Sequence, residues 1–397
     1  MPNKIKAVIL TLSVALVLMV VAGDRGVRAA SDDVYKQLTV FSEVLSRVRA
    51  DYVEDPNFTA VNDGALHGLL ESLDASSSYL TAKEYKDYKE RKDGKAAVGA
   101  TFSKRGLAAV ISVIPGGPAE KAGLENGDYI DSIEGRSTRD MSLAEIRSLM
   151  TGQAGSNVSL SVVGRRKAEP QKIIITRDVV KIPAVGEKML ENGVGYLDPI
   201  TLVKGKAQEL AARIKQLQQS GARKLVLDLR NVSEGDPAEG QAVANLFLNH
   251  GVITYMEGQK YPRVTFNAEQ GKYVSGMPLI VLVNHSTAGA AEIVAAALMD
   301  NARAETVGDK TFGVGSVQKL IEVRNGAAVI VSIAKYYSPS GKAIADAGIT
   351  PTVQAASVED EADPSDETAV APPKTIRGTP AADEQLRRAV ELIKRRS

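Results

Sequence analysis

The spacing of hydrophobic positions changes along the chain and divides it into successive parts. Within residues 33–92, apolar side chains recur at helical spacing, and Asp55-Pro56 separates two helices ahead of a third, Ala82 to Lys92. Residues 95–180 instead alternate short apolar stretches with glycine-rich turns, a pattern typical of a small β-rich domain. This pattern predicts strands at 108–114, 129–133, 158–163 and 172–176. It also predicts a short helix after the turn at 115–119 and a longer helix at 143–150.

Residues 181–356 have the pattern of an α/β domain. Two uninterrupted apolar runs, Lys224 to Arg230 and Pro278 to Asn284, are typical of buried parallel strands. Amphipathic stretches with helical spacing alternate with these runs, at 205–220, 238–248 and 290–300. Strands that alternate with helices predict a parallel sheet covered by helices.

The two ends have compositions of their own. Residues 1–30 begin with Lys4 and Lys6, continue with an apolar run and end in Ala29-Ala30, as a secretory signal does. We therefore expect an exported protein of the periplasm or cell envelope, with an uncleaved N-terminal membrane anchor as the alternative. Residues 357–378 are acidic and proline-rich and are expected to form a linker. Thr379-Pro380 resembles the start of a C-terminal helix over 379–397, which we interpret as a docking helix.

Composition narrows the chemistry. The chain has 397 residues, no cysteine and three histidines, His67, His250 and His285, none of them in a short-range pair. Disulfides and a cysteine nucleophile are excluded, and we expect no metal and no cofactor. The formal net charge of +1 does not favour nucleic-acid binding.

The stretch from Gly116 to Ile130, with its Gly-Gly-Pro-Ala turn and later Gly127-Asp128 turn, resembles the middle of a PDZ domain. PDZ domains bind the C-terminus of an extended peptide by adding it to the edge of a sheet. The resemblance implies that the peptide carboxylate is held by a loop formed by Val98, Gly99, Ala100, Thr101 and Phe102. A PDZ fold that serves only in packing is the alternative.

The order of the parts resembles that of the C-terminal processing peptidase family. The resemblance rests on short matches at Tyr52 with Asp55-Pro56, 77–80, 116–130, 228–231, 290–298 and 307–313. It implies a helical segment over 31–94, a PDZ domain inserted at 95–180, and a crotonase-like (ClpP-like) α/β core at 181–356. Members of this family are serine peptidases that use a Ser–Lys dyad, in which a desolvated lysine accepts the proton of the serine.

The chain departs from the family at the positions of the nucleophile, the base and the oxyanion-hole turn. The nucleophile motif S-A-S-A-S-E aligns so that Gly289 holds the nucleophile position. The motif F-G-K-G-[ST]-V-Q aligns so that Val314 holds the base position, while the accessory Gln is retained as Gln318. The turn D-L-R-x-N-P-G-G, which shapes the oxyanion hole, here ends in Glu234-Gly235, so that a carboxylate replaces a glycine.

These departures predict a non-hydrolytic homologue that binds protein C-termini or unfolded peptide as a regulatory or adaptor subunit. It would pair with active relatives or form an oligomer. One alternative is an active endopeptidase with a relocated dyad, in which Ser286 or Thr287 attacks and Lys310 is the base. A purely structural oligomeric scaffold is a third interpretation.

Overall fold

The computed structural model describes residues 35–92, 96–164, 169–355, 379–380 and 383–395. The predicted signal, 1–30, and the predicted linker, 357–378, lie outside these residues. Residues 35–65 and 66–397 form separate units and are described separately. Within the described part of the chain, no helix is both long enough and apolar enough to cross a membrane.

The first unit is helical, as the sequence predicts. Residues 35–51 form one helix, and α2 (Phe58–Glu71) begins after the Asp55-Pro56 break. The side chain of Asn57 accepts the amide of Ala60 at 3.2 Å, which caps the start of α2. Tyr35 and Leu38, on the first helix, are largely exposed.

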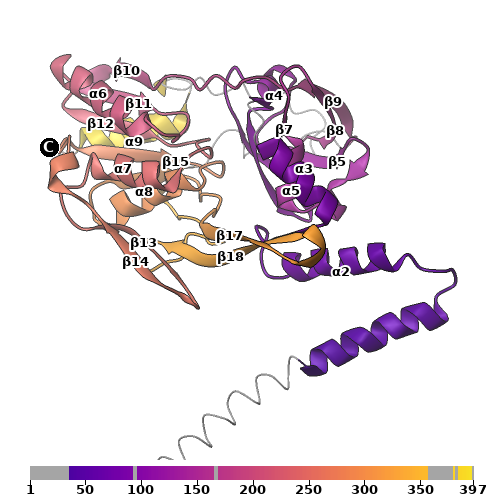
Figure 1. Cartoon of the computed structure of the whole chain (residues 1–397). Helices are drawn as coiled ribbons and strands as arrows, with labels where there is room; N and C mark the ends of the chain where they lie inside the picture. The colour runs from indigo at the N-terminus through magenta and orange to yellow at the C-terminus, as the bar shows by residue number, and fades with distance from the viewer. Residues whose placement is uncertain (1–34, 93–95, 165–168, 356–378, 381–382, 396–397) are drawn as a thin grey trace, which may run out of the picture. The chain divides into compact units, whose positions relative to one another are not determined.

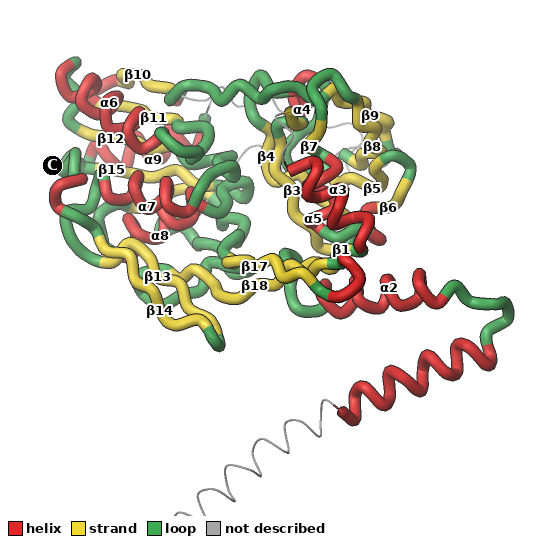
Figure 2. Tube along the Cα trace, in the orientation of Figure 1, coloured by secondary structure: helices red, strands yellow, loops and turns green. Residues whose placement is uncertain are grey.

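Residues 96–176 fold into an antiparallel sheet that packs on one main helix. The strands follow the order β3, β4, β5, β8, β9, and short β6 pairs with β5. Their bounds are Ala100–Arg105 (β3), Leu107–Val113 (β4), Tyr129–Ile133 (β5), Arg136–Ser137 (β6), Asn157–Val163 (β8) and Gln171–Thr176 (β9). The helix, α5 (Leu143–Leu149), begins where the Ser142 hydroxyl accepts the amide of Glu145. The predicted strands and helix are confirmed, and Figure 2 shows them in yellow and red.

Smaller elements complete this domain, and the expected peptide-binding loop is shorter than predicted. They are α3 (Ala82–Lys92), β2 (Ala96–Ala97), α4 (Pro118–Lys121) and β7 (Thr151–Gly152). Of the five residues expected in the loop, only Val98 and Gly99 precede β3, whereas Ala100, Thr101 and Phe102 are its first residues. The difference arises because these three residues pair with β4, with a register shift between Thr101 and Phe102.

The second sheet is the centre of the peptidase-like core. Its strands follow the order β10, β11, β12, β15, β16, β19 and are parallel except for β10, which runs antiparallel to β11. The bounds are Gly186–Leu190 (β10), Val194–Asp198 (β11), Lys224–Asp228 (β12), Leu279–Val283 (β15), Glu305–Gly308 (β16) and Val353–Gln354 (β19). The covering helices are α6 (Lys206–Gln219), α7 (Pro237–Asn245) and α8 (Ala290–Asp300). The predicted parallel sheet is confirmed.

Alternate residues of these strands enter two hydrophobic cores. Leu225 and Leu227 pack with α6, α7 and α8, whereas Val226 packs with α9 (Glu384–Lys394), drawn in yellow in Figure 1. Gly240 allows α7 to approach α8 closely, because a Cβ there would lie 2.5 Å from the carbonyl oxygen of Ala290. The parallel strands are therefore buried on both faces, which explains their uninterrupted apolar runs.

The C-terminal helix begins later than the sequence indicated. The N-cap is Asp383, whose carboxylate accepts the amide of Leu386 at 3.0 Å, and not Thr379. Aspartate is preferred over threonine as an N-cap residue, and the carboxylate of Asp383 also pairs with Arg230.

An antiparallel sheet was not predicted. Its strands are β1 (Ser78–Leu80), β13 (Val252–Gly258), β14 (Tyr261–Asn267), β17 (Ser316–Glu322) and β18 (Ala328–Tyr337). β18 pairs with β1, β13 and β17, and β13 pairs with β14. The segment expected to be wholly helical over 31–94 thus contributes one strand, because the backbone of Ser78 to Leu80 pairs with β18.

Candidate functional site

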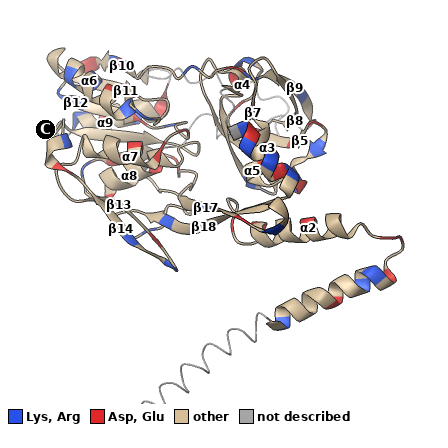
Figure 3. Ribbon diagram, viewed as in Figure 1, with Lys and Arg blue, Asp and Glu red and all other residues tan. Residues whose placement is uncertain are grey.

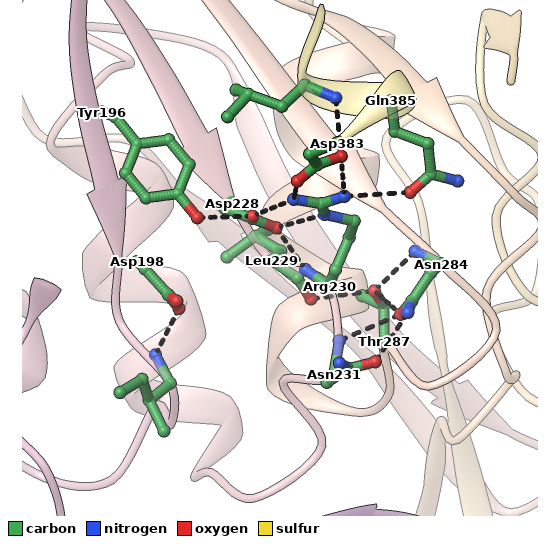
Figure 4. A network of polar contacts seen from close by, with 12 residues as sticks. Tyr196, Asp198, Asp228, Leu229, Arg230, Asn231, Asn284, Thr287, Asp383 and Gln385 are labelled. Atoms are coloured by element: carbon green, nitrogen blue, oxygen red, sulfur yellow. Dashed lines mark hydrogen bonds and ion pairs between the residues drawn. The ribbon is translucent and has the colours of Figure 1, made fainter. Parts of the chain in front are cut away.

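The turn after β12 is anchored by a buried network of charges (Figure 4). The guanidinium of Arg230 lies 2.6 Å from carboxylate oxygens of both Asp228 and Asp383, and all three side chains are buried. The hydroxyl of Tyr196 donates to Asp228 at 2.7 Å, and burial raises the pKa of that hydroxyl. Gln385 accepts a further bond from Arg230. The network joins the end of a central strand to the start of α9.

The turns after β12 and β15 are tied to each other. The side-chain oxygen of Asn284 accepts the amide of Asn231 at 2.9 Å, and its amide group donates to the side chain of Asn231 at 2.6 Å. The hydroxyl of Thr287 donates to the carbonyl of Leu229 at 2.8 Å. Thr287, an alternative nucleophile from the sequence, is fully buried in this structural role.

The predicted nucleophile and base positions face each other. Gly289 is the residue before α8 and has φ +62° and ψ −116°, a conformation in which side-chain-bearing residues are strained. A Cβ built on Gly289 would lie 4.0 Å from Cγ1 of Val314. The two positions meet beyond the carboxyl ends of the parallel strands, where sites of open α/β sheets form. Neither side chain carries an atom that can attack or accept a proton.

A buried carboxylate, Glu292, lies under this pair. It accepts the amides of Gly289 at 2.9 Å, Gly313 at 2.8 Å and Val314 at 2.7 Å, and the hydroxyl of Thr311 donates to it. Burial raises the pKa of Glu292 to about 7, although the four donors oppose that rise. Glu292 thus fixes the backbone at both Gly289 and Val314.

The residues of the alternative dyad lie in the segments that follow β15 and β16. Ser286 lies in the same turn and its amide donates to Asn284, while Lys310 is exposed. Among the described residues, no hydrogen bond joins the side chains of Ser286 and Lys310. His285 is exposed, and its ring centroid lies 5.5 Å from that of Phe312. The histidine is therefore a turn residue beside an aromatic ring.

The other retained and altered positions have structural partners. Gln318, on β17, donates its side-chain amide to the carbonyl of Ser76. A Cβ on Gly235 would lie 2.8 Å from that of Leu202, so this glycine is required by packing. Glu234 is half-buried, and burial raises the pKa of its carboxyl group, which the charge of Arg147 opposes.

The PDZ-like loop is hydrogen-bonded to the ends of β4 and α5. The carbonyl of Gly99 accepts the amide of Ile114 at 2.8 Å, and the Val98 amide donates to the carbonyl of Met150 at 3.1 Å. Gly99 has φ +75°. β3 follows this loop and is the first strand of its sheet, so its outer edge faces α5 and not another strand of that sheet.

Sequence reasoning did not identify several residues of the site. Arg147 on α5, whose guanidinium donates to the carbonyl of Phe102 at 3.2 Å, gave no motif signal. Arg230 was noted only as part of a match, and its partner Asp383 lies 153 residues away in sequence. No group of three or more His, Asp or Glu side chains is placed to hold a metal in the described part of the chain.

Two parts of the chain match models of known protein families, and full-length relatives match most of it. Residues 193–355 match the model of peptidase family S41, and residues 110–164 match a PDZ domain model. The carboxy-terminal-processing protease of Bartonella bacilliformis is 36% identical over 326 residues, which cover 80% of this chain and 75% of that protein. The carboxy-terminal processing protease CtpA of Bacillus subtilis is 31% identical, over 79% of this chain and 68% of that protein.

A solved structure agrees with these matches. The photosystem II D1 C-terminal processing protease superposes with a TM-score of 0.66 at 27% identity, covering 79% of this chain and 86% of that chain. The chain therefore belongs to peptidase family S41, as a PDZ-containing member of the carboxyl-terminal processing proteases.

Proposed function

We propose that this S41 member has lost hydrolysis and captures protein C-termini or unfolded peptide through its PDZ domain, as a regulatory or adaptor subunit. One observation supports the proposed loss of hydrolysis. The positions that would hold the nucleophile and the base face each other across 4.0 Å, and they are occupied by Gly289 and Val314. Loss of both members of a catalytic unit removes the reaction and not just part of its rate.

The surroundings support the same conclusion. Glu234 stands in the turn that would present N–H dipoles to a tetrahedral oxyanion, and a carboxylate there opposes negative charge. Thr287 is committed to the carbonyl of Leu229, and Ser286 precedes the strained turn at Gly289. A displaced nucleophile would also be misaligned with any remaining N–H donors, and catalysis tolerates misplacement of about 1 Å poorly.

The peptide-binding half rests on the edge of β3. β3 is the first strand of its sheet, follows the loop at Val98 and Gly99 and contacts α5, which supports addition of a peptide strand at this edge. In this arrangement backbone N–H groups of the loop hold the terminal carboxylate of the peptide. The protein then needs a free C-terminus in its ligand, and not a particular internal sequence.

Peptide binding is tested by fluorescence anisotropy with the mature chain and a labelled peptide that ends in an apolar residue. We expect binding of the free acid and loss of binding when the same peptide is amidated. Equal affinity for the two forms would contradict capture through the carboxylate.

Two glycine variants localise the binding. Gly99→Ala should weaken binding, because Gly99 has φ +75° in the loop. Gly106→Ala is the matched control, since Gly106 has φ +83° in the β3–β4 turn and a Cβ there has no neighbour within 4 Å. Both variants carry the same kind of backbone strain, so a difference between them reports on the loop.

The proposed place of action is outside the cytoplasm, in the periplasm or cell envelope, because residues 1–30 have the pattern of a secretory signal. There the protein would act with active relatives or as an oligomer. The exposed apolar side chains of the helix at 35–51, among them Tyr35 and Leu38, support such pairing. Cell fractionation of the full chain and of a chain without residues 1–30 tests export directly.

A further inference from the structure

The hydrogen bonds of β4 show which peptide groups of β3 face its outer edge. Phe102 on β3 pairs with Val110, whose amide donates away from β3, to the carbonyl of Asp128 at 2.8 Å. Ala100 pairs with Val113, whose amide also bonds elsewhere. Residues with such partners form the non-hydrogen-bonded pairs of an antiparallel ladder. The peptide groups of Ala100 and Phe102 therefore point away from β4, toward the edge proposed to receive a peptide.

Arg147 on α5 places a positive charge at this edge. Its guanidinium donates to the carbonyl of Phe102 at 3.2 Å, and its side chain is exposed to solvent. In the part of the chain that the structure describes, no carboxylate forms an ion pair with Arg147. A guanidinium carries five N–H donors in a planar fork, so the bond to Phe102 leaves donors for a ligand. Arg147 is thus a cation at the edge of β3 that can accommodate an anionic group.

A cavity of about 250 Å³ lies beside Arg147, and Arg147 and Ser148 line it together with Tyr88 of α3 and Ile330 of β18. The side chain of Ser148 is buried, and within the described residues its hydroxyl has no hydrogen-bond partner. A buried hydroxyl without a partner costs free energy, which a polar group of a ligand would recover. The cavity is smaller than the about 300–1,000 Å³ of pockets for drug-sized ligands, so its size suits a single side chain.

We propose that this cavity is a specificity pocket for a glutamate side chain of the bound peptide. The carboxylate of that glutamate pairs with Arg147 and accepts the hydroxyl of Ser148. This inference rests on the proposed capture of peptides by the PDZ domain. The planar fork of a guanidinium matches a carboxylate in a bidentate pair. The buried side chains of Leu143 and Ala144, which also line the cavity, suit the two methylene groups of a glutamate.

The register of β3 assigns the glutamate a position in the peptide. A peptide that runs antiparallel to β3, with its terminal carboxylate at Val98 and Gly99, pairs its last residue with Ala100. Its third residue from the C-terminus then pairs with Phe102, because edge-facing peptide groups recur at every second residue. The carbonyl of Phe102 has two lone pairs, so it can accept from both Arg147 and the peptide. The pocket therefore selects a glutamate at the third position from the C-terminus.

The pocket is tested with the full chain and three labelled peptides, all with a free C-terminus and otherwise neutral side chains. The first has glutamate at the third position from the end, the second has glutamine there, and the third has its glutamate one residue closer to the end. By fluorescence anisotropy we expect the first to bind about tenfold more tightly than the second, the factor that a hydrogen bond to a charged group supplies. The third should show no such gain, because adjacent side chains of a strand point to opposite faces.

Variants of the cavity identify the groups that meet the glutamate. Arg147→Met should remove the preference for glutamate over glutamine, and Ser148→Ala should reduce it. Arg139→Met is the matched control, because it removes the same charge from an exposed arginine of the same domain. The ratio of the two affinities is compared for each protein. A uniform effect on all peptides, such as one from losing the bond to Phe102, therefore cancels.

The remaining outcomes separate this inference from the proposed function. If the wild-type protein binds the glutamate and glutamine peptides equally, or if Arg147→Met or Ser148→Ala keeps the full preference, the glutamate pocket is wrong and peptide capture stands. An equal gain for the shifted glutamate also overturns the pocket. If no peptide binds while circular dichroism shows a folded protein, peptide capture fails, and the pocket fails with it.

Discussion

Glu292 is the titratable residue closest to the centre of the altered site. It is fully buried, and its two oxygens hold the amides of Gly289, Gly313 and Val314 in place. A side chain without two hydrogen-bond-accepting oxygens would lose some of these hydrogen bonds to the backbone. Glu292 therefore holds the backbone at the positions aligned with the nucleophile and the base of the family.

The pKa of Glu292 predicts a pH dependence of stability. Burial raises that pKa from 4.5 to about 7, so the folded state holds the proton more tightly than the unfolded state between these values. The stabilising contribution is complete below pH 4.5 and is lost as the pH rises through 7. The loss amounts to about 3 kcal/mol, at 1.36 kcal/mol per pKa unit.

The measurement is the free energy of unfolding in urea between pH 4 and pH 8, for the wild type and for Glu292→Gln. The glutamine is neutral throughout, so the difference between the two curves isolates Glu292 from other titrating groups. We expect the wild type to lose stability relative to the variant as the pH rises. Parallel curves would contradict the assignment.

The element whose docking depends most on one side chain is α9. Arg230 forms ion pairs with both Asp228, at the end of β12, and Asp383, the N-cap of α9. Arg230→Met would leave two buried carboxylates without their cation. We expect it to lower the free energy of unfolding by about 3–5 kcal/mol and to expose α9 to limited proteolysis.

Arg213→Met provides the matched control for this variant. Arg213 pairs with Glu187 at 3.1 Å on a partly exposed surface of α6 and β10. Its loss should change the free energy of unfolding by about 0–1 kcal/mol. Equal effects of the two substitutions would show that the buried network does not fix α9.

Elements with a distinct periodicity could be predicted from the sequence, and others could not. The apolar runs of β12 and β15 were sufficient to predict these strands, because both faces of each strand are buried. β17 and β14 gave no comparable signal, since most of their side chains are partly or fully exposed, and β14 contains Pro262, a residue typical of edge strands. α3 was predicted with its observed bounds, although Figure 3 shows that Lys and Arg mix with Asp and Glu along it.

At the scale of the whole molecule, the sequence identified Gly289 and Val314 at the positions aligned with the nucleophile and the base. It did not predict the side-chain contacts around these positions. Gly289 and Val314 were identified by alignment with family motifs, and the structure places them face to face. The contact of Ser233 with Thr101 joins residues 132 positions apart, and no local pattern encodes such a pairing. Side-chain contacts between residues so far apart in sequence can be predicted only after the fold is known.

Restoration of the dyad tests whether the rest of the site still supports catalysis. We expect Gly289→Ser combined with Val314→Lys to remain inactive on casein, because Glu234 still brings negative charge to the oxyanion turn. Peptide binding by the same double variant, with unchanged preference for the free acid, is the control for folding. Hydrolysis by this variant would show that Glu234 does not block the reaction.

The loss of hydrolysis is tested most directly by a casein-cleavage assay with the purified wild-type protein, Ser286→Ala and Lys310→Ala. We predict no cleavage above background by the wild type and no difference among the three proteins. Cleavage by the wild type that disappears in either variant would contradict the account, because it would show that a relocated serine and lysine carry out the reaction.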